Sequence, residues 1–84
     1  MNSIKGWMIA ERQRTYDKLR VNMLRNCSYV KDEDIDVAFS MSSLEYMDGL
    51  LEYDNQSGHF YVGYICGLSN TLDQLEKEPS HATA

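Results

Sequence analysis

The chain has 84 residues and a formal net charge of −5, which allows one small domain. No segment approaches the ~20 consecutive apolar residues that cross a bilayer. The first ten residues also lack the apolar centre of a signal peptide. These features predict a soluble, cytoplasmic protein with no membrane partner, folded as one helical domain over residues 1–78 with a flexible tail at residues 79–84.

A domain of this size has a marginal core, because it buries only about 60% of the surface that its unfolded chain exposes. Cys27 and Cys66 could form one bridge at most, and neither belongs to a metal-binding motif. We therefore expect two reduced thiols, no metal or other cofactor, and support from association into a homo-oligomer.

The charges are divided unevenly along the chain. Residues 1–31 carry seven basic and two acidic side chains, a net charge of +5. Residues 32–84 carry eleven acidic side chains and one basic one, a net charge of −10. Such a division predicts either that the two halves attract each other or that the protein presents two different surfaces.

The first helix is expected from about Ser3 to Asn26, where good helix formers follow a possible cap at Asn2 or Ser3. Apolar residues at helical spacing are expected to face the core: Ile9, Tyr16, Leu19, Met23, Cys27 and Val30. At 100° per residue, Arg14, Lys18 and Arg25 form a basic stripe on the opposite side.

The second helix is expected to begin near Asp32, because carboxylates crowd its first turn, and to end before the polar residues 54–58. Its apolar residues form two neighbouring lines: Val37, Leu44, Met47 and Leu51, and then Phe39, Tyr46, Leu50 and Tyr53. The remaining side carries Asp34, Glu45, Asp48 and Glu52. An apolar arc this wide requires two neighbouring helices or a partner chain.

The third helix is expected from His59 to about Lys77, before Pro79. Five apolar residues repeat with the 4-3 spacing of a coiled coil: Tyr61, Ile65, Leu68, Leu72 and Leu75. This repeat predicts an oligomer seam. The fold class is therefore all-α, as a small three-helix bundle or an assembly of helical hairpins.

Residues 51–65 also fit a β-hairpin, with two aromatic-rich runs around a turn that ends in glycine, which would make the fold α+β. Residues 32–76 contain no lysine or arginine, so a wing in this region could not neutralise phosphates as a winged-helix wing does. The helical interpretation is therefore favoured.

The sequence contains no recognisable catalytic motif. His59 and His81 are its only histidines and neither has a partner at a suggestive spacing, while Cys66 fits a buried, inert thiol. The acidic run at residues 32–36 lacks the glycine and the final glutamate of a calcium loop. We expect neither enzymatic activity nor a metal site.

The composition indicates a small protein-binding module, because five methionines and nine aromatic residues are many for so small a core. The acidic second helix is the expected contact surface, through Glu45, Tyr46, Met47, Asp48, Glu52 and Tyr53. Such a surface would suit an inhibitor or regulator of a larger, nucleic-acid-handling enzyme. Its carboxylates could mimic a nucleic acid, as in small inhibitors encoded by viruses of bacteria.

Two alternative functions also fit the sequence. The basic stripe of Arg14, Lys18 and Arg25 could bind a nucleic acid or another anionic ligand, although the acidic half of the chain would repel a polyanion. The same bases could instead pair with the carboxylates of the second helix. The chain could also be a structural subunit of an oligomeric assembly.

Overall fold

The computed structural model describes residues 3–41 and 43–77, and all regular structure in these residues is helical. The helices are α1 (Ser3–Asn26), α2 (Asp32–Met41), α3 (Leu44–Gly49) and α4 (Gln56–Lys77). The all-α prediction is confirmed. The alternative β-hairpin is wrong, because residues 56–65 belong to α4. The predicted tail at residues 79–84 lies outside the described residues.

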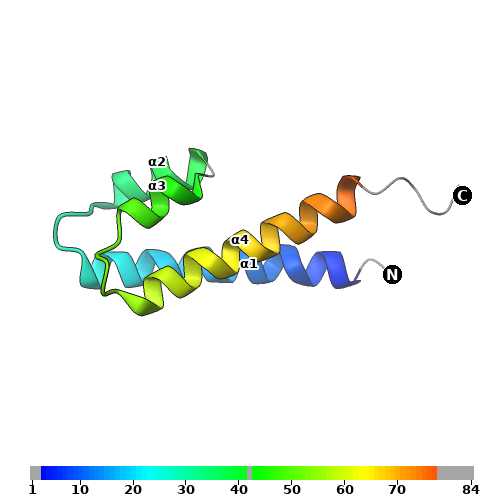
Figure 1. Cartoon of the computed structure of the whole chain (residues 1–84), viewed down its shortest axis with the longest axis horizontal. Coiled ribbons are helices and arrows are strands. Elements are labelled where there is room, and N and C mark those ends of the chain that lie inside the picture. Colours follow the sequence, from blue (N-terminus) through cyan, green and yellow to red (C-terminus); the bar gives the residue numbers. More distant parts are fainter. Residues whose placement is uncertain (1–2, 42, 78–84) are drawn as a thin grey trace, which may run out of the picture.

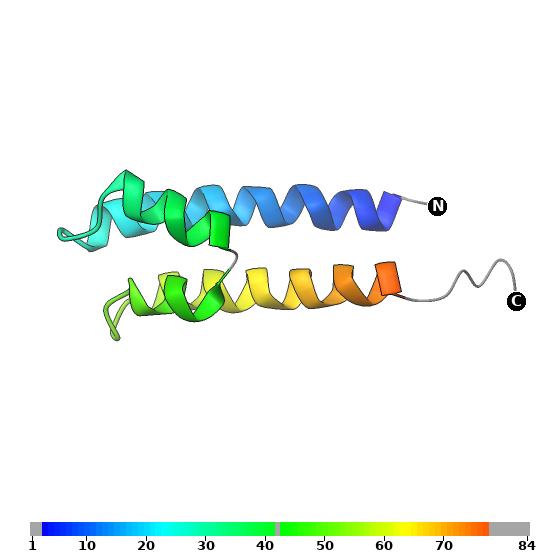
Figure 2. The same cartoon turned by 90° about the horizontal axis from the view of Figure 1, so that it is seen from above.

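The two long helices, α1 and α4, lie side by side and antiparallel as a helical hairpin (Figures 1 and 2). The short helices α2 and α3 cover one side of this hairpin near the end where the chain turns, with α2 against α1 and α3 against α4. Among the described helices, none has the length and hydropathy needed to cross a bilayer.

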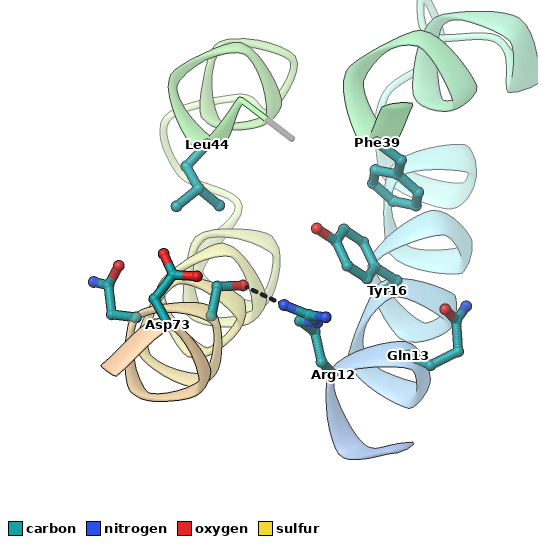
Figure 3. Close-up of a pocket in the computed structure, with 8 residues that line it drawn as sticks. Arg12, Gln13, Tyr16, Phe39, Leu44 and Asp73 are labelled. Carbon is teal, nitrogen blue, oxygen red and sulfur yellow. Dashed lines mark hydrogen bonds between the residues drawn. The ribbon is translucent and has the colours of Figure 1, made fainter. Parts of the chain in front are cut away.

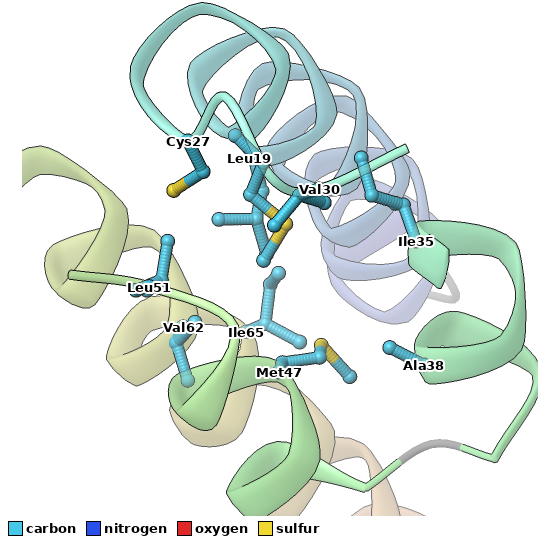
Figure 4. Close-up of a cluster of buried hydrophobic side chains, with 10 residues drawn as sticks. Leu19, Cys27, Val30, Ile35, Ala38, Met47, Leu51, Val62 and Ile65 are labelled. Atoms are coloured by element: carbon cyan, nitrogen blue, oxygen red, sulfur yellow. The ribbon is translucent and has the colours of Figure 1, made fainter. Parts of the chain in front are cut away.

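The predicted second helix is divided in two, which is a correction to the sequence interpretation. Ser43 has extended backbone angles, and its hydroxyl accepts a hydrogen bond from the Tyr46 N–H at 3.1 Å, which caps a new helix. The chain can therefore change direction between α2 and α3. As a result Ile35 and Ala38 of α2 and Met47 of α3 all reach one core (Figure 4).

This main core lies under α2 and α3, and the largest fully buried side chains belong to it: Leu19, Met23, Ile35, Met47, Ile65 and Cys27. A second, smaller cluster of Met8, Leu68 and Leu72 joins the outer halves of α1 and α4. Burial of these side chains is the main favourable contribution to folding.

Four of the six residues predicted to face the core from the first helix and the residues after it are buried: Leu19, Met23, Cys27 and Val30. Tyr16 is half-buried against the Phe39 ring, 4.5 Å away between centroids. Ile9 is the exception, because 46% of its surface is exposed. It lies about two turns beyond Tyr16, where α2 no longer covers α1.

Helix α4 begins three residues earlier than the sequence suggested, because Asn55 caps it. The Asn55 Oδ1 atom accepts a hydrogen bond from the Gly58 N–H at 3.0 Å, and its amide donates to Asn22 Oδ1 at 2.8 Å. The first bond satisfies a free N–H of the helix start. The second joins the connection between α3 and α4 to α1.

Candidate functional site

The acidic surface expected from the sequence is only partly formed. Glu45, Asp48 and Glu52 are exposed, as are Tyr46 and, at 93%, Tyr53. Met47, by contrast, is fully buried in the core and cannot be a partner contact without unfolding α3. The continuous acidic and apolar helix on which that prediction rested does not exist, because α3 has only six residues.

His59 holds α3 and the following connection against the start of α4. Its Nδ1 atom lies 2.6 Å from Asp48 Oδ1, and its Nε2 atom lies 3.0 Å from the Glu52 carbonyl oxygen. Both partners are hydrogen-bond acceptors, so only the doubly protonated imidazolium can donate to both. The bond to Asp48 is accordingly the main cause that raises the pKa of His59 above its usual 6.5.

We predict that this pair makes stability depend on pH. Because the His59 pKa is raised on folding, its contribution is fully present below about pH 6.5 and is lost as the pH rises through the folded-state pKa. Urea unfolding should therefore show a free energy that falls as the pH rises above about 6.5. His59→Gln should flatten this decrease, and an unchanged pH dependence in that variant would contradict the prediction.

The three bases of the predicted anion-binding stripe lie on the surface, but they have different surroundings. Arg14 donates two hydrogen bonds to Glu11, at 3.0 and 2.8 Å. Lys18 and Arg25 form no ion pair within residues 3–41 and 43–77, and they line one shallow groove of about 390 Å³ with Val21 and Tyr61. None of the three pairs with a carboxylate of α3.

Aromatic side chains of α4 lie beside these bases. Glu11 accepts a hydrogen bond from the Tyr64 hydroxyl at 2.9 Å. The hydrogen bond with Arg14 is the main cause that lowers the pKa of Glu11, and the bond with Tyr64 is the second. The Tyr64 ring stacks on Phe60 with 6.0 Å between centroids, and Phe60 meets the Tyr61 ring edge-on at 5.9 Å. The basic stripe thus continues into a row of three aromatic rings.

We use the name hairpin face for the side of the helical hairpin formed by Trp7, Arg14, Lys18, Val21 and Arg25 of α1 and by Phe60, Tyr61 and Tyr64 of α4. Residues 7, 14, 18, 21 and 25 follow the 3-4 spacing of one helix side. Trp7 is 54% exposed, Val21 49% and Phe60 65%. Trp7 and Val21 lie about 21 Å apart on α1, so the exposed apolar side chains are distributed along the hairpin.

The hairpin face points away from α2 and α3. Val62 lines a cavity together with Leu44 of α3, so this side of α4 faces the short helices. Phe60 precedes Val62 by two residues and therefore points about 200° away around the helix axis. In Figure 1, no described helix lies on the side of the hairpin opposite α2 and α3.

The predicted oligomer seam is used mainly within the chain. Ile65, Leu68 and Leu72 are buried in the two cores that join α4 to α1. Tyr61 is half-buried and Leu75 is 40% exposed. The coiled-coil spacing therefore indicates a packing stripe, but its partner is α1 of the same chain.

A second concave region is a cavity of about 580 Å³ (Figure 3). It lies between the end of α2, the start of α3 and the middle of α1 and α4. It is lined by Arg12, Gln13, Tyr16, Phe39, Leu44, Ser69, Asn70 and Asp73. Arg12 Nη1 donates to Ser69 Oγ at 3.3 Å, and burial raises the pKa of Tyr16. Its lining contains the Ser69 hydroxyl and the Asp73 carboxylate but neither a histidine nor a cysteine, and the surface is mainly polar.

Sequence reasoning did not group the exposed residues of the hairpin face. Trp7 was not grouped with the aromatic residues of the last helix. Val21, Phe60 and Tyr64 were not identified. The 3-4 spacing of Trp7 with the basic residues was the available signal.

Within the described residues, no group of three or more histidine, cysteine or carboxylate side chains is arranged to hold a metal ion. No family model, curated protein or solved structure matches this chain.

Proposed function

We propose that this protein is a non-enzymatic binding module that recognises another protein through the hairpin face. The observation that carries the proposal is the exposure of Trp7, Val21 and Phe60 on one side of two packed helices. Tryptophan, tyrosine and arginine are the residues that most often dominate the binding energy of protein interfaces. The module would act on its partner as an inhibitor, a regulator or a structural subunit.

The hairpin face supports this role better than the acidic surface of α3 does. The central apolar residue of that surface, Met47, is buried, and Asp48 is held by His59. The hairpin face instead extends along helices of 24 and 22 residues, which gives a rigid and continuous contact area.

Photocrosslinking would locate the contact surface. A benzophenone amino acid at Val21 is expected to crosslink the partner protein in cells, whereas the same group at Tyr53, on the acidic surface, is expected to give little product. The crosslinked protein would then be identified and purified. Products from position 53 alone would overturn the proposal and assign binding to the acidic surface.

The purified partner would then give the energetics. Trp7→Ala combined with Phe60→Ala is expected to weaken binding at least about 30-fold, because a single hot-spot residue contributes about 2 kcal/mol or more. Tyr46→Ala combined with Tyr53→Ala removes two exposed aromatic rings of the acidic surface and is the matched control. Circular dichroism would verify that both variants remain helical.

A second candidate function is the binding of a single-stranded nucleic acid. It is favoured by one observation, that Lys18, Arg25 and Tyr61 line the same groove and so combine charge with a stacking surface. It predicts retention on a DNA or RNA resin that decreases steeply with salt and with loss of either base. Weak and salt-independent retention would eliminate it.

A further inference from the structure

The hairpin face contains a shallow groove that could accommodate a helix of another protein. Two antiparallel helices that lie side by side leave a shallow groove between them, and here the groove is lined by Val21 of α1 and Tyr61 of α4. The apolar face of an amphipathic helix fits such a groove through residues at positions i, i+3, i+4 and i+7. Trp7 and Phe60, about half exposed or more, provide the apolar surface that such a helix would cover.

The charge of this face determines which helix it would accept. Lys18 and Arg25 form no ion pair among the described residues. With Arg14 they give this face three positive charges against the two negative charges of Glu11 and Asp17, and Asp17 lines the same groove. Positive charge around an apolar groove is complementary to a helix with carboxylates beside its apolar stripe.

A second copy of the chain is a poorer occupant. In a two-fold symmetric dimer the same surface meets itself, so Arg14, Lys18 and Arg25 of one copy would lie close to the same basic group of the other. Glu11 and Asp17 offset only two of the three positive charges in each copy. The carboxylates of α4 lie elsewhere, because Asp73 lines the cavity on the opposite side and Glu76 pairs with Lys5.

A nucleic acid is also a poorer occupant. Only two bases of this face lack an intramolecular partner among the described residues, and the whole chain carries a net charge of −5. The molecule is 19–22 Å across its two shorter axes, about two Debye lengths at physiological salt. At this distance the carboxylates of α2 and α3 are largely screened, so the small number of free bases is the argument against a polyanion.

We infer that the hairpin face binds one acidic amphipathic helix of a partner protein, which packs into the groove between α1 and α4. This inference rests on the proposed function and adds the chemistry of the partner. The bound helix would cover Trp7 and Phe60 with its apolar side and place its aspartates or glutamates near Lys18 and Arg25.

Two designed peptides of about three heptads test the inference. They share one apolar stripe, and one carries glutamates beside it while the other carries lysines. The glutamate peptide is expected to bind at least about tenfold more tightly in fluorescence anisotropy, with an affinity that decreases as salt is raised from about 50 to 200 mM. Equal affinities, or no binding of the glutamate peptide, would overturn the inference.

Charge reversal supplies the decisive variant. Lys18→Glu with Arg25→Glu should reverse the preference, so that the lysine peptide binds more tightly. Lys31→Glu with Lys77→Glu changes the net charge by the same amount away from the hairpin face, and it should leave the order unchanged. Reversal by both pairs would mean that net charge alone decides, which would overturn the inference.

Two further measurements separate the other occupants. Tighter binding of a single-stranded oligonucleotide than of the glutamate peptide would assign the face to nucleic acid. A dimer in light scattering that is lost in Trp7→Ala would assign it to a second copy. If the peptides fail but crosslinking from Val21 succeeds, the proposed function stands and only the acidic-helix inference falls.

Discussion

Replacing Met47 by alanine is expected to lower the free energy of unfolding by about 2–5 kcal/mol. Met47 is fully buried, and its side chain lies in the main core near Ile65 and Ala38 (Figure 4). Truncation removes the apolar atoms that fill this space and leaves a cavity that helices held from several sides cannot collapse to fill. For a domain of 84 residues, this is a large part of the total stability.

Urea denaturation monitored by circular dichroism would measure this change. Tyr46→Ala, at the neighbouring exposed position, is the control and should alter the free energy of unfolding by no more than about 0.5 kcal/mol. A Met47→Ala protein with normal stability and impaired partner binding would show that Met47 is a surface contact and that the core is placed wrongly.

Gly58→Ala is expected to destabilise the protein by about 1–3 kcal/mol, although alanine is the better helix former. A Cβ atom at this position would lie 2.7 Å from Leu51 Cδ2 and 2.9 Å from both Asn22 Oδ1 and Asn55 Nδ2. Those two asparagines are hydrogen-bonded to each other, and Asn55 also caps α4. The clash would therefore disturb both the cap and the connection to α1.

Gly63→Ala in the same helix is the matched comparison. A Cβ atom there would have no neighbour within 4 Å, so the substitution should stabilise the protein by up to about 1 kcal/mol through helix propensity. The two variants should thus change the urea midpoint in opposite directions. Stabilisation by both substitutions would rule out the close packing of Gly58.

Local sequence signals were sufficient for the first helix and for the start of the second. The bounds of α1 and the carboxylate-rich start of α2 follow from helix formers, caps and charge near the helix end, which act within a few residues. The Ser43 cap that divides α2 from α3 was also a local signal, but the apolar pattern continues across it and concealed the break.

Local sequence signals could not show which helix or chain packs against each apolar stripe. The 4-3 repeat of Ile65, Leu68 and Leu72 predicts a packed stripe, but periodicity does not distinguish a second chain from α1 of the same chain. Met47 was expected at an interface for the same reason, whereas the turn at Ser43 directs it into the core.

By itself, therefore, the sequence determined the helical class, the bounds of the first helix and the separation of basic from acidic residues along the chain. These properties depend on neighbours within one or two turns. Only the tertiary structure decided that α2 and α3 cover one side of the hairpin and that Lys18 and Arg25 lie beside Tyr61 on the other. Contacts between helices distant in sequence depend on packing, which no local pattern specifies.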